Sequence, residues 1–249
     1  MDIPLAAIGA ALVLASVYAL GGGVGEGEMS ARVWRRRRWV SAAAGVSVAY
    51  VFVDVLPELG AQNRTIQEAL GGADMLFAEQ RVYVLALVSF VVMYGLEHIV
   101  LSGRERRREA IEAERHDAVY WLHLGGFAAY SALVGYLLVE RAERGIVTLA
   151  VYTLAMAVHF VIVNHSLAEE HGRVYRRRGH LALAASVIAG CAAGLAMPLS
   201  DVAFARLFAL LAGGVVITSL KSELPDDRHG RFWPFCLAAL LFAVLLMLA

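Results

Sequence analysis

The sequence from Ile146 to Gly172 reads IVTLAVYTLAMAVHFVIVNHSLAEEHG. Its first half is apolar, and the run approaches the ~20 apolar residues that a helix needs to cross a bilayer. Polar and ionisable groups follow within about three helical turns. They are His159, Asn164, His165, Ser166 and Glu169. Because an ionisable group at membrane depth is costly unless it faces a cavity or a partner, these residues are candidates for function.

Helical geometry groups these side chains by face. At ~100° per residue, His159 and Ser166 share one face, and His165 and Glu169 share another. The alternative is a helix whose last turns have reached cytoplasmic water, which we favour for Glu169 and for the Glu170-His171 pair that follows. Apolar residues flank His159 on both sides. We therefore predict that His159 points into a helical bundle, toward the fourth or second span, rather than to lipid.

The composition is that of a membrane protein. The chain has 249 residues, of which 59% are hydrophobic, and its mean hydropathy is +0.63, above the soluble average. The formal net charge is zero, so no basic field attracts nucleic acid, and we expect no nucleic-acid partner. Cys191 and Cys236 lie in apolar runs, which indicates neither a disulfide framework nor a cysteine metal site. The N-terminal MDIPLAAIG lacks a basic region and is interpreted as part of a retained span.

Apolar runs divide the chain into eight expected membrane spans with no soluble domain between them. We therefore expect an all-α polytopic bundle forming a single domain over residues 1–249, with the lipid bilayer as its surroundings. The spans are expected at residues 3–23, 39–59, 81–101, 119–139, 146–168, 181–199, 203–221 and 232–249.

Arginine and lysine fall mainly in alternate loops. Seventeen of the 22 lie in the loops after spans one, three, five and seven. The other five are Arg64, Arg81, Arg141, Arg144 and Arg206. Since cytoplasmic loops carry the excess of positive residues, this asymmetry predicts both termini outside. We expect a multi-pass protein of the plasma (inner) membrane.

Two segments resemble each other within the chain. Residues 45–59 read GVSVAYVFVDVLPEL and residues 213–227 read GGVVITSLKSELPDD. Both have an early glycine, central β-branched residues and a polar group before Leu-Pro. With opposite directions through the membrane, they indicate an inverted repeat that relates spans one to three to spans six to eight, around spans four and five. A chance match over so few residues is the alternative.

The chain resembles the ZIP (Zrt/Irt-like) family of divalent-metal transporters. The stretch AAGVSVAYVFVDVLPEL is similar to that family's second helix, and FVVMYGLEHIVL to its third. The stretches AGGVVITSLKSELPDD and FWPFCLAALLFAVLLMLA resemble the last two helices of that family. Eight spans with both termini outside also fit the family. The resemblance implies a transporter of divalent cations and no enzyme.

The resemblance fails where the family binds metal. Its fourth helix carries His-Asn-x-x-Asp/Glu-Gly and its fifth carries His-Glu-x-Pro-His-Glu, which form a two-metal site at the bilayer midplane. The matching stretch here is GFAAYSALVG, with Phe127 and Tyr130 at ligand positions. In HFVIVN, His159 is kept, whereas Phe160 and Val163 replace ligands. A second match, HSLAEE, lies nearer the cytoplasmic end. We therefore expect no two-metal midplane site.

A single altered site is the remaining expectation for metal. Divalent cations need several oxygen or imidazole ligands that converge in space. The candidates are His159, His165, Asp54, His123, Asn164 and Glu169. Zinc is then the possible substrate, and a second copy of the chain is a candidate partner in a homodimer. A ZIP fold that has lost metal transport and serves another solute, regulation or assembly is the alternative. An intramembrane zinc hydrolase would need three converging ligands and a water position.

Overall fold

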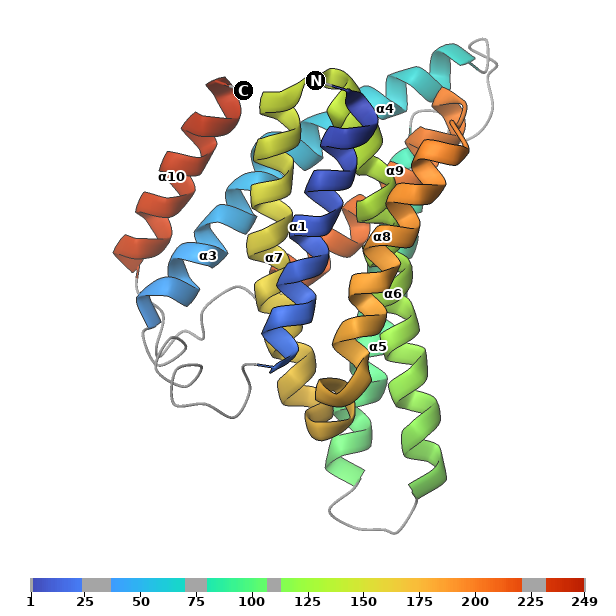
Figure 1. Cartoon of the computed structure of the whole chain (residues 1–249), viewed down its shortest axis with the longest axis vertical. Coiled ribbons are helices and arrows are strands. Elements are labelled where there is room, and N and C mark those ends of the chain that lie inside the picture. The colour runs from blue at the N-terminus through green and yellow to red at the C-terminus, as the bar shows by residue number, and fades with distance from the viewer. Residues whose placement is uncertain (1, 24–36, 70–79, 107–112, 221–231, 249) are drawn as a thin grey trace.

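The computed structural model describes residues 2–23, 37–69, 80–106, 113–220 and 232–248 (Figure 1). Several basic loop residues and the second Leu-Pro motif lie outside these ranges. The parts of the orientation and repeat predictions that rest on them therefore fall outside the described residues. Within the described ranges the secondary structure is helical. An all-α protein with membrane-length apolar helices is therefore confirmed.

The helices follow the predicted order along the chain. They are α1 (Ile3–Gly23), α3 (Arg37–Tyr50), the π-helical η1 (Val51–Val55), α4 (Leu56–Ala69), α5 (Arg81–Arg106), α6 (Ala113–Arg144), α7 (Ile146–Val174), the π-helical η2 (Tyr175–Gly179), α8 (His180–Ala196), α9 (Asp201–Thr218) and α10 (Phe232–Leu248).

The described residues form six helices that are long and apolar enough to cross a membrane, with α10 as a shorter apolar helix. Eight separate spans were expected. The fifth and sixth expected spans instead belong to one helical run of 51 residues, Ile146–Ala196. Gly172 lies inside this run with a φ of 56°, a left-handed conformation that glycine adopts without strain. The chain turns there, so that α7 and α8 run in opposite directions (Figure 1).

The second span extends beyond its expected end at residue 59. The π-helical turn η1 leads directly into α4, and the helix continues to Ala69. A proline has no N–H and its ring clashes with the carbonyl four residues earlier, so a wider turn before Pro57 relieves that conflict. Beyond Pro57 the helix is amphipathic, with Leu59 and Ile66 buried.

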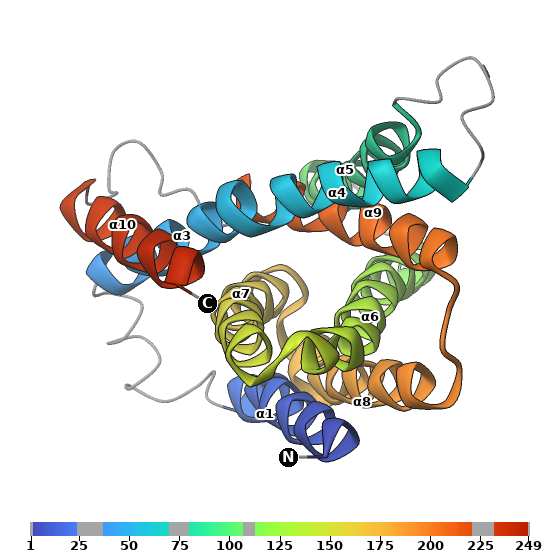
Figure 2. The same cartoon turned by 90° about the horizontal axis from the view of Figure 1, so that it is seen from above.

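The bundle has three layers when viewed from above (Figure 2). α1 and α8 form one side, α6 and α7 lie in the middle, and α3, α4, α5, α9 and α10 form the other side. α3 packs along α10, α5 along α9, and α6 along α8. The middle layer is therefore covered on both faces. α1 begins and α10 ends at the same end of the bundle (Figure 1), which we call the terminal end; the opposite end is the kink end, where Gly172 lies.

Large aromatic side chains fill the centre of the bundle. Tyr18, Phe160 and Tyr152 are at most 2% exposed, and the Tyr18 and Phe160 rings lie 4.5 Å apart. The outer surfaces are apolar as well, for example at Leu240 and Leu241 of α10. An apolar exterior over a packed interior is the pattern expected where lipid replaces water as the solvent.

Candidate metal centre

The six predicted ligands do not form one cluster. The structure places Asp54 in an ion pair near the terminal end, and His159 and Asn164 inside the bundle. His165 and Glu169 contact each other, and His123 joins two residues that we had interpreted as solvated. Each environment is described below.

Asp54 of η1 and Glu58 of α4 belong to an ionic network with two arginines of α6. Arg141 is only 3% exposed and donates to the Asp54 carboxylate at 3.1 and 3.5 Å. One turn along α6, Arg144 donates to both carboxylate oxygens of Glu58 at 2.7 and 2.9 Å and also pairs with Glu140. A cation arriving at Asp54 would therefore meet the Arg141 guanidinium already in place.

Arg141 also contacts α7, the other helix of the middle layer, through an aromatic ring. Its guanidinium carbon lies 5.3 Å from the centre of the Tyr152 ring of α7. A guanidinium over an aromatic face is attracted by the ring quadrupole. The network was not predicted from the sequence, where Asp54 was a candidate metal ligand. Arg141 and Arg144 are the signal that could have found it, being three residues apart on one helix face.

His159 lies inside the bundle, as predicted. It is 1% exposed, and its ring centre lies 5.8 Å from that of Tyr130 in α6. Its Nε2 is 3.4 Å from the Thr218 hydroxyl of α9, which itself donates to the Gly214 carbonyl at 2.8 Å. His159 therefore contacts a hydroxyl and aromatic rings.

Asn164 and the His165–Glu169 pair occupy separate environments. Asn164 is 4% exposed and its side-chain oxygen accepts from the Tyr175 hydroxyl at 2.6 Å. His165 Nε2 lies 3.2 Å from a Glu169 carboxylate oxygen one turn along α7. The Glu169 side chain is 68% exposed, which agrees with the solvated interpretation of that residue.

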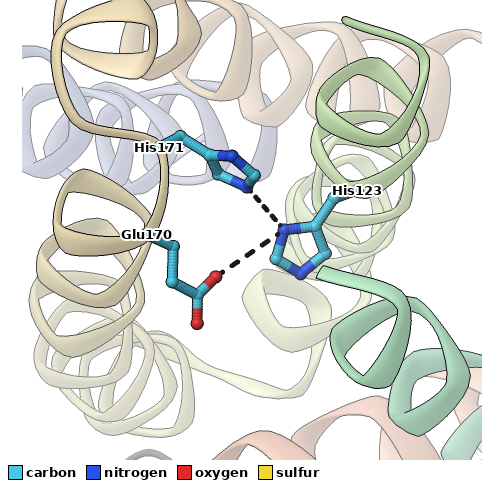
Figure 3. Close-up of side chains that lie close together, drawn as sticks. All are labelled: His123, Glu170 and His171. Carbon is cyan, nitrogen blue, oxygen red and sulfur yellow. Dashed lines mark hydrogen bonds and ion pairs between the residues drawn. The ribbon is translucent and has the colours of Figure 1, made fainter. Parts of the chain in front are cut away.

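The one triad of convergent metal-ligand atoms among the described residues is formed by His123, Glu170 and His171 (Figure 3). His123 Nδ1 lies 2.8 Å from His171 Nε2 and 3.7 Å from a Glu170 carboxylate oxygen. One ligand atom from each residue lies within 4.8 Å of the others. His123 comes from α6, whereas Glu170 and His171 end the straight part of α7. We call these three residues the His-Glu-His cluster.

Aromatic rings pack against the His-Glu-His cluster. The His123 ring is 5.1 Å from Phe127, one turn along α6, in an edge-to-face arrangement. The His171 ring packs in the same way against Tyr120, at 5.0 Å. Gly172 follows His171 directly, so the cluster lies where the chain turns from α7 toward α8. His123 is buried, and Glu170 and His171 are partly exposed.

The separations fit a small divalent cation. Zinc binds imidazole nitrogen and carboxylate oxygen at ~2.0–2.2 Å in a tetrahedral arrangement, which places neighbouring ligand atoms about 3.3 Å apart. The two observed separations, 2.8 and 3.7 Å, lie on either side of that value. Small side-chain rotations would therefore be enough. Two imidazoles and a carboxylate form a donor set suited to zinc and to other first-row divalent metals.

Known proteins offer no assignment for this site. Neither the family models, the curated proteins nor the solved structures that were compared with the chain give a match. At the positions where the ZIP resemblance places midplane ligands, Phe127, Tyr130, Phe160 and Val163 are all at most 5% exposed. These side chains are packed against their neighbours and do not provide the set of nitrogen and oxygen ligands that a divalent cation needs.

Proposed function

We propose that the chain is a ZIP-like integral membrane transporter that moves a divalent metal cation of the zinc, iron or manganese class through a single-metal site. The observation that carries the proposal is the convergence of His123, Glu170 and His171 from two helices of the middle layer. The cation is the substrate of this site. We infer no catalytic reaction.

Three ligands and an open position suit transport better than storage. Structural zinc sites use four protein ligands, which fill the coordination sphere of the ion. Sites with three protein ligands instead leave one coordination position for water or substrate. Conduction requires binding that is strong enough for entry and weak enough for release. His123 is buried and Glu170 is partly exposed, so the cluster borders both the bundle interior and its surface.

We further propose eight membrane crossings. Because α7 and α8 run in opposite directions on either side of Gly172, the 51-residue run accounts for two crossings instead of one. α10 supplies the eighth. An even number agrees with the position of the first and last helices at the same end of the bundle (Figure 1).

An inverted repeat is supported by helix pairing. The proposed repeat exchanges α1 with α8, α3–α4 with α9, α5 with α10, and α6 with α7. Under this exchange, the contact between α3 and α10 corresponds to the contact between α9 and α5. Both contacts are present. The contact of α1 with α7 likewise maps onto that of α8 with α6, and both are present. These pairs follow the proposed exchange of elements, whereas within the described ranges the contacts of α6 with α1 and with α5 have no counterparts of similar extent between α7 and α8 or between α7 and α10.

Two local features recur at equivalent positions of the repeat. Gly45 and Gly213, the early glycines of the two motifs, each lie against a neighbouring backbone. A Cβ at Gly45 would meet the Phe235 carbonyl of α10, and one at Gly213 would meet the Ala86 carbonyl of α5. A π-helical turn begins at Val51 in the first motif and at Ser219 in the second, six residues after each glycine.

The orientation follows from the basic loops. We propose a plasma (inner) membrane protein with both termini outside, as the arginine asymmetry predicts. The kink end, with the His-Glu-His cluster, then faces the cytoplasm, and the Asp54–Arg141 network lies toward the outside. The homodimer stays a prediction that the mass of the purified protein–detergent complex would test.

The second candidate is a ZIP-like protein that has lost metal transport. Two observations favour it, namely the ion pair that occupies Asp54 and the aromatic packing at the midplane positions. Such a protein would serve another solute, regulation or assembly. The two candidates differ in whether the His-Glu-His cluster binds and releases metal.

Metal uptake separates the two candidates. Purified protein in liposomes is supplied with zinc, iron, manganese or cadmium, and the flux is compared with that of empty liposomes. We expect flux in the wild type and its loss in His123→Ala and His171→Ala. Absence of flux for every metal, with folded protein, would favour the non-transporting candidate.

Binding measurements provide the control for folding. Zinc titration of the detergent-solubilised protein should give one site per chain. Changing a group that only supports a metal ligand costs ~10–100-fold in affinity, so loss of His123 or His171 itself should cost about 100-fold or more. His98→Ala is the matched control, because His98 is an exposed histidine on α5 stacked on Tyr94 outside the cluster. Its zinc affinity should equal that of the wild type.

A further inference from the structure

A groove with an apolar floor opens at the terminal end of the bundle, away from the His-Glu-His cluster. It lies where α4 ends and where α5 and α9 begin. Its volume is about 490 Å³, within the ~300–1,000 Å³ of small-molecule sites. Five aliphatic side chains of α4 and α5 line it, together with two arginines, Arg81 of α5 and Arg206 of α9.

The floor of this groove faces the membrane. α5 is the least buried of the six membrane-length helices, because only 17% of the residues in its apolar stretch are buried. Val84 and Val88, one turn apart on α5, are 47% and 49% exposed and line the groove. In a membrane-spanning bundle such side chains meet lipid acyl chains, so the groove is open to lipid where Val84 and Val88 line it.

The two arginines give the groove a charged mouth. Arg81 is the first residue of α5, and Arg206 lies in the second turn of α9, so both lie near the terminal end of their helices. Arg206 is exposed and has no hydrogen-bond or ion-pair partner within the part of the chain that the structure describes. A cation at this depth needs an anionic partner or contact with the headgroup region. A guanidinium matches a phosphate through two parallel N–H···O bonds.

We propose that this groove binds an anionic phospholipid, with an acyl chain along Ile66, Val84 and Val88 and the phosphate between Arg81 and Arg206. The aliphatic floor offers nothing to a free phosphate ion, whereas the arginines offer nothing to a neutral chain. A lipid with a charged headgroup satisfies both parts of the groove. This inference is independent of the metal site.

Charge argues against a second copy of the chain as the occupant. A two-fold dimer interface uses the same patch on both subunits. An interface centred on this groove would bring two copies of Arg81 and Arg206 together, four cations in all, in surroundings of low dielectric constant where like charges repel strongly. A phospholipid instead brings the opposite charge.

Lipid binding to the full chain in detergent tests the proposal. Native mass spectrometry would be used to titrate the purified protein with phosphatidylglycerol, with phosphatidylcholine of the same acyl chains, and with inorganic phosphate. We expect one phosphatidylglycerol bound at least about tenfold more tightly than phosphatidylcholine, because only the former carries net charge for the arginines. Inorganic phosphate should not bind. Equal affinity for the two lipids, or binding of phosphate alone, would overturn the proposal.

Variants assign the binding to the groove. Arg206→Gln and Arg81→Gln should each weaken phosphatidylglycerol binding about tenfold, since each removes one charge-assisted pair of hydrogen bonds. Arg64→Gln is the matched control, because Arg64 is an exposed arginine on α4 that does not line the groove, and it should bind as the wild type. Val88→Trp should weaken binding of the acyl chain while leaving both arginines in place.

Two outcomes contradict this assignment. If Arg64→Gln weakens binding as much as Arg206→Gln, the lipid is held by general surface charge. If the wild type is a dimer that Arg206→Gln dissociates, the groove is a protein interface. Thermal unfolding of each variant identifies any that fail to fold, and Val88→Trp then tests the groove without either arginine substitution.

Discussion

The Arg141 guanidinium lies 3.1 Å from the Asp54 carboxylate and connects the π-helical turn of the second span to the fourth span. Arg141 is 4% exposed at its side chain, and Asp54 is 22% exposed. Breaking a buried ion pair by removing one partner costs ~3–5 kcal/mol, because the other charge is left uncompensated. This pair is thus expected to hold η1 and α6 together near the terminal end.

Asp54→Asn should therefore lower the free energy of unfolding by about 3 kcal/mol or more. Arg64→Gln, which removes an exposed arginine of α4 outside this network, should change the free energy of unfolding by no more than ~0.5 kcal/mol. Thermal or denaturant unfolding in detergent measures both. The double variant Asp54→Asn with Arg141→Leu should recover much of the lost stability, since no buried charge remains unpaired. Equal costs for Asp54→Asn and Arg64→Gln would contradict the buried-pair interpretation.

The repeat makes a prediction about two glycines. A side chain at Gly45 would lie 3.0 Å from the Ala239 nitrogen, and one at Gly213 would lie 2.9 Å from the Phe90 nitrogen, besides meeting the carbonyls already named. Gly45→Ala and Gly213→Ala should each cost ~1–3 kcal/mol, because the facing backbone must move away. The reference is Gly95→Ala, which has open space around its Cβ and should change stability by no more than ~1 kcal/mol.

Unequal effects would count against the repeat. If Gly45→Ala destabilises and Gly213→Ala behaves like Gly95→Ala, the two close approaches are not equivalent. Unfolding temperatures of the three purified variants give the comparison directly.

The helical order was predictable from the sequence because a bilayer demands long apolar runs and charges must leave it. The end of the second span was not, since Glu58 and Arg64 make residues 58–69 look like a polar loop. In the structure this stretch is an amphipathic helix with Leu59 and Ile66 buried. The sequence also did not predict that α7 and α8 belong to one continuous helical run, because the turn between them depends on a single glycine in a left-handed conformation.

The candidate site was only partly predictable. His123 was a candidate, but its partner His171 lies 48 residues away along the chain with Glu170 just before it, and no spacing pattern connects them. Glu170 and His171 were interpreted as a solvated helix end, and their polar positions are consistent with that. What brings His171 to His123 is the side-by-side packing of α6 and α7. Helical periodicity places residues on one face but does not choose the neighbouring helix.

The orientation can be tested by labelling. In a variant without Cys191 and Cys236, a single cysteine is placed at exposed Arg64 or at exposed Arg177. We expect a membrane-impermeant maleimide added to intact cells to label Arg64→Cys, because the loops rich in arginine stay inside. Arg177→Cys should react only after permeabilisation. The opposite pattern would invert the topology and place the His-Glu-His cluster outside.

His159 provides the last comparison, because the resemblance to the ZIP family and the geometry of the structure assign it different roles. Its partners include the Thr218 hydroxyl and the Tyr130 and Phe160 rings, none of which is a strong metal donor. His159→Ala should therefore lower the free energy of unfolding by ~1–3 kcal/mol, through a lost hydrogen bond and a small cavity. Zinc affinity should change less than about twofold, whereas His123→Ala should lose about 100-fold or more. Folded His159→Ala that no longer binds or transports zinc, beside a fully active His123→Ala, would move the metal site to the middle of the bundle.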